Sequence, residues 1–174
     1  MKTILETNRL YLRELTKEDA IHFYQINNDP EVIAFTGDSP FDSVEDAQEF
    51  LQSYLQQYQD HNMGRWAVCL KETNEVLGWC GLKYHPEDCL VDIGYRFYRE
   101  HWGKGFATEA CKACLDYGFK HLDLKRIVAH VHVDNAASHR VALKSGLIYV
   151  KDFIYDGQPA KLYQLRKNEY LSNS

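Results

Sequence analysis

The sequence predicts a domain of the mixed α/β class, in which helices cover both faces of a sheet of six or seven strands. Seven segments carry apolar residues at every second position, and the segments between them carry apolar residues at steps of three and four. The resulting order is β-α-α-β-β-β-α-β-α-β-β, which implies antiparallel hairpins and one parallel pair joined by a crossover helix. At 174 residues with 45% hydrophobic content, the chain suits one domain over residues 1–174, with a tail from about Leu171.

The first half of the chain begins with a strand over residues 9–15 and continues into two helices. Thr16 caps the first helix, which runs to about Asn27 because the residue before Pro30 is driven out of the α region. A short helix or turn and a loop follow, and Ser43 caps the second helix. The apolar stripe of this second helix consists of Ala47, Phe50, Leu51, Tyr54, Leu55 and Tyr58.

Strands and helices alternate more closely in the second half. The glycine or asparagine turns between apolar segments separate hairpin strands, and Gly146 ends the last predicted helix. The predicted elements are strands at 65–71, 76–85, 90–99 and 126–133, helices at 106–121 and 135–146, and a final hairpin that turns around 156–159.

A glycine-containing loop stands between the central strand and the helix that follows it. The loop reads WGKGFA, with Gly103, Lys104 and Gly105 directly before the helix start and Thr108 in its first turn. The first amides of a helix lack intrahelical partners and lie at the positive end of the helix dipole. Glycines adopt positive φ and let the backbone approach an anion closely. The loop therefore predicts a binding site for a diphosphate group.

Two common phosphate-binding motifs do not match this loop. The chain has no GxxxxGK[ST] string, and Thr108 stands where the third glycine of GxGxxG would be. The loop instead resembles motif A of the GNAT superfamily of acyl-CoA-dependent N-acyltransferases, [Q/R]-x-x-G-x-[G/A]. Gly105 and Ala107 hold the last two positions, and Trp102 replaces Gln or Arg. The longer string IGYRFYREHWGKGFATEA resembles the ribosomal-protein-alanine N-acetyltransferases, and the resemblance extends over about residues 9–163.

This resemblance implies that the two parallel strands splay apart and that the pantetheine arm of acetyl-CoA lies in the gap between them. It assigns the acetyl carbonyl to backbone groups near the end of the central strand, where a bulge would free an amide to polarise the thioester. The cofactor-binding residues that it implies are Phe97, Tyr98, Arg99, Trp102, Gly103, Lys104, Gly105, Phe106, Ala107, Thr108, Asn135 and Ser138.

A second motif, N-x-x-S…K-x-G, consists of Asn135, Ser138, Lys144 and Gly146. The pattern is equally typical of a helix capped by Asn135, with Ser138 in its first turn. The resemblance implies that Asn135 contacts the pantetheine arm and that Ser138 lies near the sulfur. Many members carry a tyrosine four residues after the serine, where it protonates the leaving thiolate. Because Ala142 stands there, Ser138 becomes the candidate acid.

The reaction also needs a base, because only an unprotonated amine attacks a thioester. The candidate catalytic carboxylates are Asp92 on the central strand and Asp156 in the final hairpin. The alternatives are a surface carboxylate for Asp92 and a turn residue for Asp156. Glu14 and Glu31 are candidates for attracting a cationic acceptor. The sequence does not choose among these four carboxylates.

Composition narrows the classes of function. The net charge of −5 argues against a nucleic-acid binder and suits a cationic substrate, although an ordinary solvated surface would carry the same charge. No signal peptide or membrane-length apolar run is visible. Cys111 and Cys114 share one face of a predicted helix and the chain offers no obvious set of four zinc ligands, so we expect a cytoplasmic protein with buried, reduced thiols. His130 and His132 share one strand face and are interpreted as sheet residues, not metal ligands. Trp66 and Trp79 are interpreted as core aromatics.

We therefore expect an enzyme that moves the acetyl group of acetyl-CoA to a primary amine by direct attack in a ternary complex. The favoured acceptor is a protein N-terminal amine, on a ribosomal protein for example; polyamines, aminoglycosides and other small amines are the alternatives. Two alternatives belong to other classes: a non-catalytic acyl-CoA-binding module, suggested by Ala142, and a nucleotide binder. A monomer or homodimer without nucleic acid, membrane or metal is expected.

Overall fold

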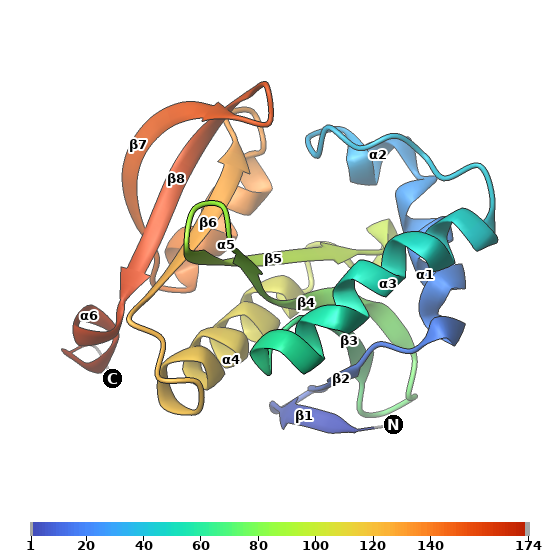
Figure 1. Ribbon diagram of the computed structural model, residues 1–174, viewed down its shortest axis with the longest axis horizontal. Helices are drawn as coiled ribbons and strands as arrows, with labels where there is room; N and C mark the ends of the chain where they lie inside the picture. The colour runs from blue at the N-terminus through green and yellow to red at the C-terminus, as the bar shows by residue number, and fades with distance from the viewer. Residues whose placement is uncertain (1, 173–174) are drawn as a thin grey trace.

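Eight strands form one mixed sheet in the computed structural model, which describes residues 2–172 (Figure 1). All neighbouring strands are antiparallel except β5 and β6, which are parallel. The prediction of a mixed sheet is confirmed, but it missed β1, whose four residues are too few for alternation to stand out. In spatial order the strands are β1 (Thr3–Glu6), β2 (Leu10–Glu14), β3 (Arg65–Leu70), β4 (Val76–His85), β5 (Leu90–Phe97), β6 (Arg126–His132), β8 (Gln158–Arg166) and β7 (Ile148–Tyr155).

Helices connect the strands close to the predicted positions. Within the described residues they are α1 (Ala20–Asn27), α2 (Pro30–Ile33), α3 (Val44–His61), α4 (Phe106–Lys120), α5 (Ala136–Lys144) and α6 (Lys167–Ser172), with 3₁₀ turns η1 (Lys17–Asp19) and η2 (Arg99–His101). The side chain of Ser43 caps α3 as predicted. α6 includes Leu171, so the predicted tail is wrong for residues 171–172, and residues 173–174 lie outside the described part.

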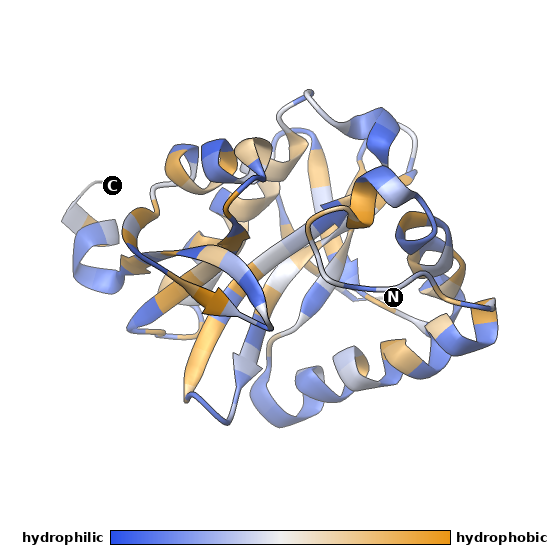
Figure 2. Cartoon of the chain, turned by 90° about the horizontal axis from the view of Figure 1, so that it is seen from above, coloured by the Kyte–Doolittle hydropathy of each residue, from blue (hydrophilic) through white to orange (hydrophobic). Residues whose placement is uncertain are grey.

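The sheet separates two hydrophobic cores, and hydrophobic residues gather on the strands between the helices (Figure 2). One core lies between the sheet and α4 and includes Trp66, Leu82 and Phe119. The other lies between the sheet and α1 and α3 and includes Phe23 and Trp79. The two tryptophans are core aromatics as predicted, on opposite faces of the sheet.

β5 and β6 meet at one point and then diverge. Their register contains a single pair, Asp92 with Val128, although β5 continues to Phe97 and β6 pairs along its length with β8. The parallel strands therefore splay toward their carboxyl ends, as the resemblance implies. The predicted bulge near residues 97–99 is absent, because the register between β4 and β5 runs without a shift up to Phe97.

Candidate active site

The glycine loop has the backbone geometry that anion binding requires. Gly103 has a φ of 74° and Gly105 a φ of 82°, both in the left-handed region. Gly105 is the N-cap residue of α4, and no side chain caps this helix, so its first amides are left for a ligand. A Cβ atom at Gly103 would meet no other atom within 4 Å, so the loop has open space on that side.

Arg9 holds this loop against the start of α4. Its Nη1 donates to the carbonyl of Lys104 at 3.0 Å, its Nε donates to Glu109 at 2.7 Å, and its guanidinium lies 4.5 Å from the ring centroid of Phe106. Its Nη2 lies 3.5 Å from where a Cβ of Gly105 would be and 2.7 Å from Glu109 Oε2, so the loop is bordered by an Arg9–Glu109 ion pair. The sequence alone does not predict this role of Arg9, because nothing near Arg9 in the sequence signals a contact 95 residues away.

The splay leaves backbone amides of β5 facing the gap. Tyr98 donates its amide to a β4 carbonyl at 3.0 Å, so by alternation the amides of Tyr95 and Phe97 face away from β4. The carbonyl of Phe97 accepts a hydrogen bond from the indole of Trp102 at 3.1 Å. Phe97 is the last residue of β5. The amide of Tyr98 is already used within the sheet, and Arg99 belongs to η2.

Asn135 and Ser138 come together at the start of α5. Asn135 Oδ1 accepts a hydrogen bond from the amide of Ser138 at 3.1 Å, so the helix-capping interpretation is confirmed. Ser138 Oγ lies 2.8 Å from the hydroxyl of Tyr95, which comes from β5. Burial raises the pKa of Tyr95, so its phenol stays protonated at neutral pH. Ala142 is buried one turn further along α5.

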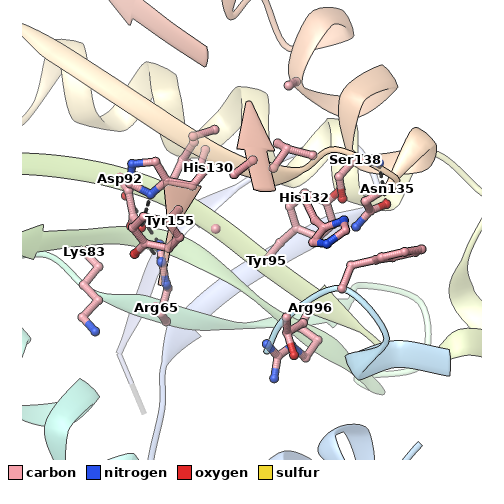
Figure 3. Close-up of a pocket in the computed structure, with 18 of the residues that line it drawn as sticks. Arg65, Lys83, Asp92, Tyr95, Arg96, His130, His132, Asn135, Ser138 and Tyr155 are labelled. Carbon is pink, nitrogen blue, oxygen red and sulfur yellow. Dashed lines mark hydrogen bonds and ion pairs between the residues drawn. The ribbon is translucent and has the colours of Figure 1, made fainter. Parts of the chain in front are cut away.

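A cavity of about 440 Å³ opens between β5 and β6 and is lined from both faces of the sheet. Tyr95, Ser138 and Ala142 line it on the face that carries α4 and α5. Figure 3 shows Asp92, His130, Tyr155 and Arg65 gathered at one end and Asn135 and Ser138 at the other. The residues contributed on the α1–α3 face include Phe23, Tyr54, Arg65, Trp79, Lys83, His85, Asp92 and Arg96.

A buried ion network lies at the centre of the α1–α3 face. Arg65 Nη2 donates to Asp92 Oδ1 at 2.7 Å, and His85 Nε2 lies 3.1 Å from Asp92 Oδ2. Gly94 makes room for this network, since a Cβ there would lie 2.7 Å from Arg65 Nη2. Burial alone would raise the pKa of Asp92, but the charge of Arg65 and the contact with His85 outweigh it and lower the pKa to about 2. Asp92 is only 7% exposed, so its interpretation as a surface carboxylate is wrong.

Arg96 forms the neighbouring wall of the cavity. Its Nη1 donates to Asn27 at 2.6 Å and its Nη2 donates to Asp38 at 2.7 Å. Its guanidinium lies 5.4 Å from the ring centroid of Trp79. These contacts tie α1 and the loop after α2 to β5, so the wall is built from segments that are far apart in the sequence.

Some of the other predicted residues line the cavity and some do not. Asp156 lines the cavity from the β7–β8 turn, where its φ of 48° confirms the turn interpretation. His130 and His132 lie in β6, as predicted, and both also line the cavity. Glu14 pairs with Lys2 at 3.6 Å, and neither Glu14 nor Glu31 lines the cavity.

Three further observations concern metal ions, thiols and membranes. Within residues 2–172, the one group of three potential metal ligands within 4.8 Å of one another is Glu75, Glu100 and His101, away from the cavity. Cys69, Cys80, Cys111 and Cys114 are buried free thiols, as expected, and Cys89 is exposed. No helix in the described part of the chain is long and apolar enough to span a bilayer.

The sequence and the fold both match known acetyltransferases. The family model described as "Acetyltransferase (GNAT) domain" matches residues 9–148. An uncharacterized N-acetyltransferase, p20, from Bacillus licheniformis is 37% identical, over 95% of this chain and 97% of that protein. A GNAT-family acetyltransferase from Bacillus anthracis has a similar structure, with a TM-score of 0.83, 24% identity and coverage of 96% of this chain and 99% of that one.

A spermidine N-acetyltransferase from Vibrio cholerae, solved in complex with CoA and spermine, also shares the fold. Its TM-score is 0.80 at 22% identity, with coverage of 95% of this chain and 99% of that one. The family match spans most of the chain and agrees with the glycine loop, the splayed strands and the cavity described above. This protein is therefore an acetyltransferase that belongs to the GNAT family.

Proposed function

We propose that this acetyltransferase moves the acetyl group of acetyl-CoA to a protein N-terminal amine, by direct attack of the amine in a ternary complex. The charge balance of the cavity is the observation that favours this acceptor. Three cationic side chains face three carboxylates: Arg65, Lys83 and Arg96 against Asp38, Asp92 and Asp156. A polyamine carries several positive charges and needs a surplus of carboxylates, whereas a peptide N-terminus brings one ammonium group.

The residues present fit acetyl-CoA. The amides from Gly103 to Thr108 would hold its diphosphate, with Arg9 and Lys104 as nearby cations. The pantetheine arm would then enter the gap from the carboxyl end of β5. The amides of Tyr95 and Phe97 would hydrogen-bond this arm and the acetyl carbonyl, which polarises the carbonyl for attack.

Ser138 is the acid that we propose for the leaving thiolate. Its Oγ would give a proton to the sulfur, and the Tyr95 hydroxyl, 2.8 Å from it, would return one to Ser138. This pair stands in for the tyrosine that many members carry at the position of Ala142. The chain thus has a hydroxyl relay beside the expected position of the sulfur, which supports turnover.

The two candidate carboxylates suit different roles. Asp92, with a pKa of about 2, accepts a proton poorly at neutral pH, which makes it a weak general base. Asp156 is exposed at the cavity rim and forms no ion pair among the described residues, so its charge is available to an incoming ammonium group. We assign Asp156 to attraction of the acceptor.

Small amines are the second candidate acceptors. The curated relatives include both a spermidine N(1)-acetyltransferase and a ribosomal-protein-serine acetyltransferase, so their names do not choose between the two classes. The mixed charge of the cavity favours a peptide over a polyamine, and an acceptor with a single amine next to neutral groups would also fit.

The test is the rate of CoA release from acetyl-CoA with a panel of acceptors. The panel contains peptides with different N-terminal residues, the same peptides with blocked N-termini, spermidine and an aminoglycoside. We expect release with free peptide N-termini and none with the blocked controls. Faster release with spermidine than with any peptide would contradict the proposed acceptor, and acetyl-CoA binding without release across the panel would contradict the proposed reaction.

A further inference from the structure

His130 occupies the first position beyond the junction of the two parallel strands. β5 and β6 are paired at Asp92 and Val128, and the next residues on the same face are Gly94 and His130. Gly94 has no side chain. Of these two residues, therefore, only His130 places a side chain, its imidazole, on the α1–α3 face. Because the diphosphate loop follows the open end of β5, the thioester at the far end of the coenzyme would come to rest near this junction.

The two ring nitrogens of His130 have different surroundings. Nδ1 is buried without a hydrogen-bond partner and lies 3.9 Å from Oδ2 of Asp92. Nε2 makes no hydrogen bond with the described residues and is not among the enclosed atoms, so it is open to the cavity. The ring stacks on Tyr155, with 4.1 Å between centroids and 22° between planes, which fixes its orientation.

Charged and titratable groups from several elements face this ring. They are Asp92 on β5, His85 on β4, Arg65 on β3, Tyr155 on β7 and Asp88 in the turn between β4 and β5. Burial lowers the pKa of His130 below its ordinary value of 6.5, and the charge of Asp92 opposes this effect. The imidazole is therefore neutral at pH 7. The carboxylate of Asp92 favours the tautomer that carries the proton on Nδ1, which leaves the lone pair on Nε2 facing the cavity.

We propose that His130 is the general base of the acetyl transfer and that Asp92 is the positioning residue that keeps its proton on Nδ1. This inference rests on the proposed function. Nε2 accepts a proton from the acceptor nitrogen as that nitrogen bonds to the acetyl carbon. The carbon–sulfur bond breaks, the sulfur keeps the electron pair, and the thiolate takes a proton from Ser138. The imidazolium then gives its proton to water, and the Ser138–Tyr95 pair takes one proton back from water, so protons and charge balance over the cycle.

The first test compares His130→Gln with His121→Gln, the same change at an exposed position on the C-cap of α4, outside the cavity. We expect His130→Gln to lower kcat by about 100-fold, with the affinity for acetyl-CoA within about twofold of wild type. The acid limb of the wild-type pH profile of kcat/KM, which lies below pH 6.5, disappears in this variant. We expect His121→Gln to keep both the wild-type kcat and the acid limb of the kcat/KM profile. Wild-type kcat with an unchanged acid limb in His130→Gln overturns the proposal.

The second test does not depend on turnover, so it separates this inference from the proposed function. Imidazole nitrogen NMR of the wild-type protein identifies the tautomer and the pKa of His130, with His130→Gln used for assignment. We expect a neutral ring with the proton on Nδ1 at pH 7. A proton on Nε2, or a ring still protonated at pH 7, contradicts the role of His130 even if the protein acetylates amines. Absence of acetyl transfer from wild type to every acceptor instead contradicts the proposed function.

Discussion

The two faces of the sheet meet at the same gap, but they offer different chemistry to it. On the α4–α5 face the gap is lined by apolar side chains, by Asn135 and Ser145 at the two ends of α5, and by the hydroxyl pair of Tyr95 and Ser138. On the α1–α3 face it is lined by a buried network of Arg65, Asp92 and His85. The difference suits the proposed division of labour, in which one face would supply a proton to the leaving group and the other would receive the amine and remove its proton.

The largest expected effect tests whether the α1–α3 face depends on its buried ion pair. Arg65→Met leaves the carboxylate of Asp92 buried without its main partner. We expect the free energy of unfolding to fall by about 3–5 kcal/mol, measured by urea denaturation. Lys125→Met, which removes an exposed partner of Asp123, is the control and should leave the midpoint nearly unchanged. If both changes lowered the free energy of unfolding by the same small amount, the buried ion pair would not stabilise the α1–α3 face.

The next effect concerns the glycine loop that serves the α4–α5 face. Gly105→Glu places a strained side chain and a negative charge at a position with a φ of 82°, so we expect acetyl-CoA affinity to fall by more than about 100-fold in calorimetry. Gly157→Glu is the matched control, because Gly157 has a φ of 72° in the β7–β8 turn. Unchanged affinity in Gly105→Glu would argue against this loop as the diphosphate site.

Acid titration tests the charge network without a mutation. Because the pKa of Asp92 is lowered from 3.8 to about 2 in the folded protein, its ionised form stabilises the fold at pH values above 3.8. This stabilisation, about 2 kcal/mol, is lost as the pH falls from about 4 toward 2. Urea denaturation of wild type and Asp92→Asn over this range should give unfolding free energies that converge on acidification. A constant difference between the two proteins would contradict the lowered pKa.

A smaller effect tests the hydroxyl pair of the α4–α5 face. We expect Ser138→Ala to lower kcat by about 10- to 100-fold and Tyr95→Phe by less, while acetyl-CoA affinity stays within about twofold. Ser53→Ala, on the exposed side of α3, is the control. A wild-type kcat in Ser138→Ala would contradict the role of Ser138 as the acid and leave it as a residue of the first turn of α5.

The smallest expected effect lies at the rim. Asp156→Asn removes a carboxylate that makes no ion pair among the described residues, so the fold should be unaffected. We expect KM for a peptide acceptor to rise by about threefold at low ionic strength, and the difference to shrink in 0.5 M salt. A KM for the variant equal to that of wild type at low salt would remove Asp156 from the acceptor site.

The part of the site that the sequence predicted is the part that is local in sequence. The glycine loop and the start of α4 are contiguous, so their spacing indicated an anion site. The Asn135 motif fits within one helix, where spacing was equally typical of a helix cap and the family resemblance supplied the functional interpretation. Arg65, His85, Asp92 and His130 come from four strands. Alternation assigns each to a face, but it does not tell whether that face is open to solvent or covered, which is why a surface carboxylate remained an alternative for Asp92.

The fold, like the glycine loop, was predicted where its signal is local in the sequence and missed where it depends on distant segments. Long alternating strands and capped helices carry their signal locally, and these agree with the structure to within a few residues. The short strand β1 pairs with the edge of β2, and the single pair between β5 and β6 joins two strands that α4 separates in the sequence. Neither feature is encoded in a local pattern.

A crystal structure with bound CoA tests the central claim most directly, since the claim is that one gap brings the coenzyme and the acceptor together from opposite faces. The account predicts diphosphate oxygens about 3 Å from the amides between Gly103 and Thr108, the sulfur beside Ser138 Oγ, and an open path from the sulfur to His130. A diphosphate bound elsewhere, or a coenzyme that lies outside the gap between β5 and β6, would contradict it.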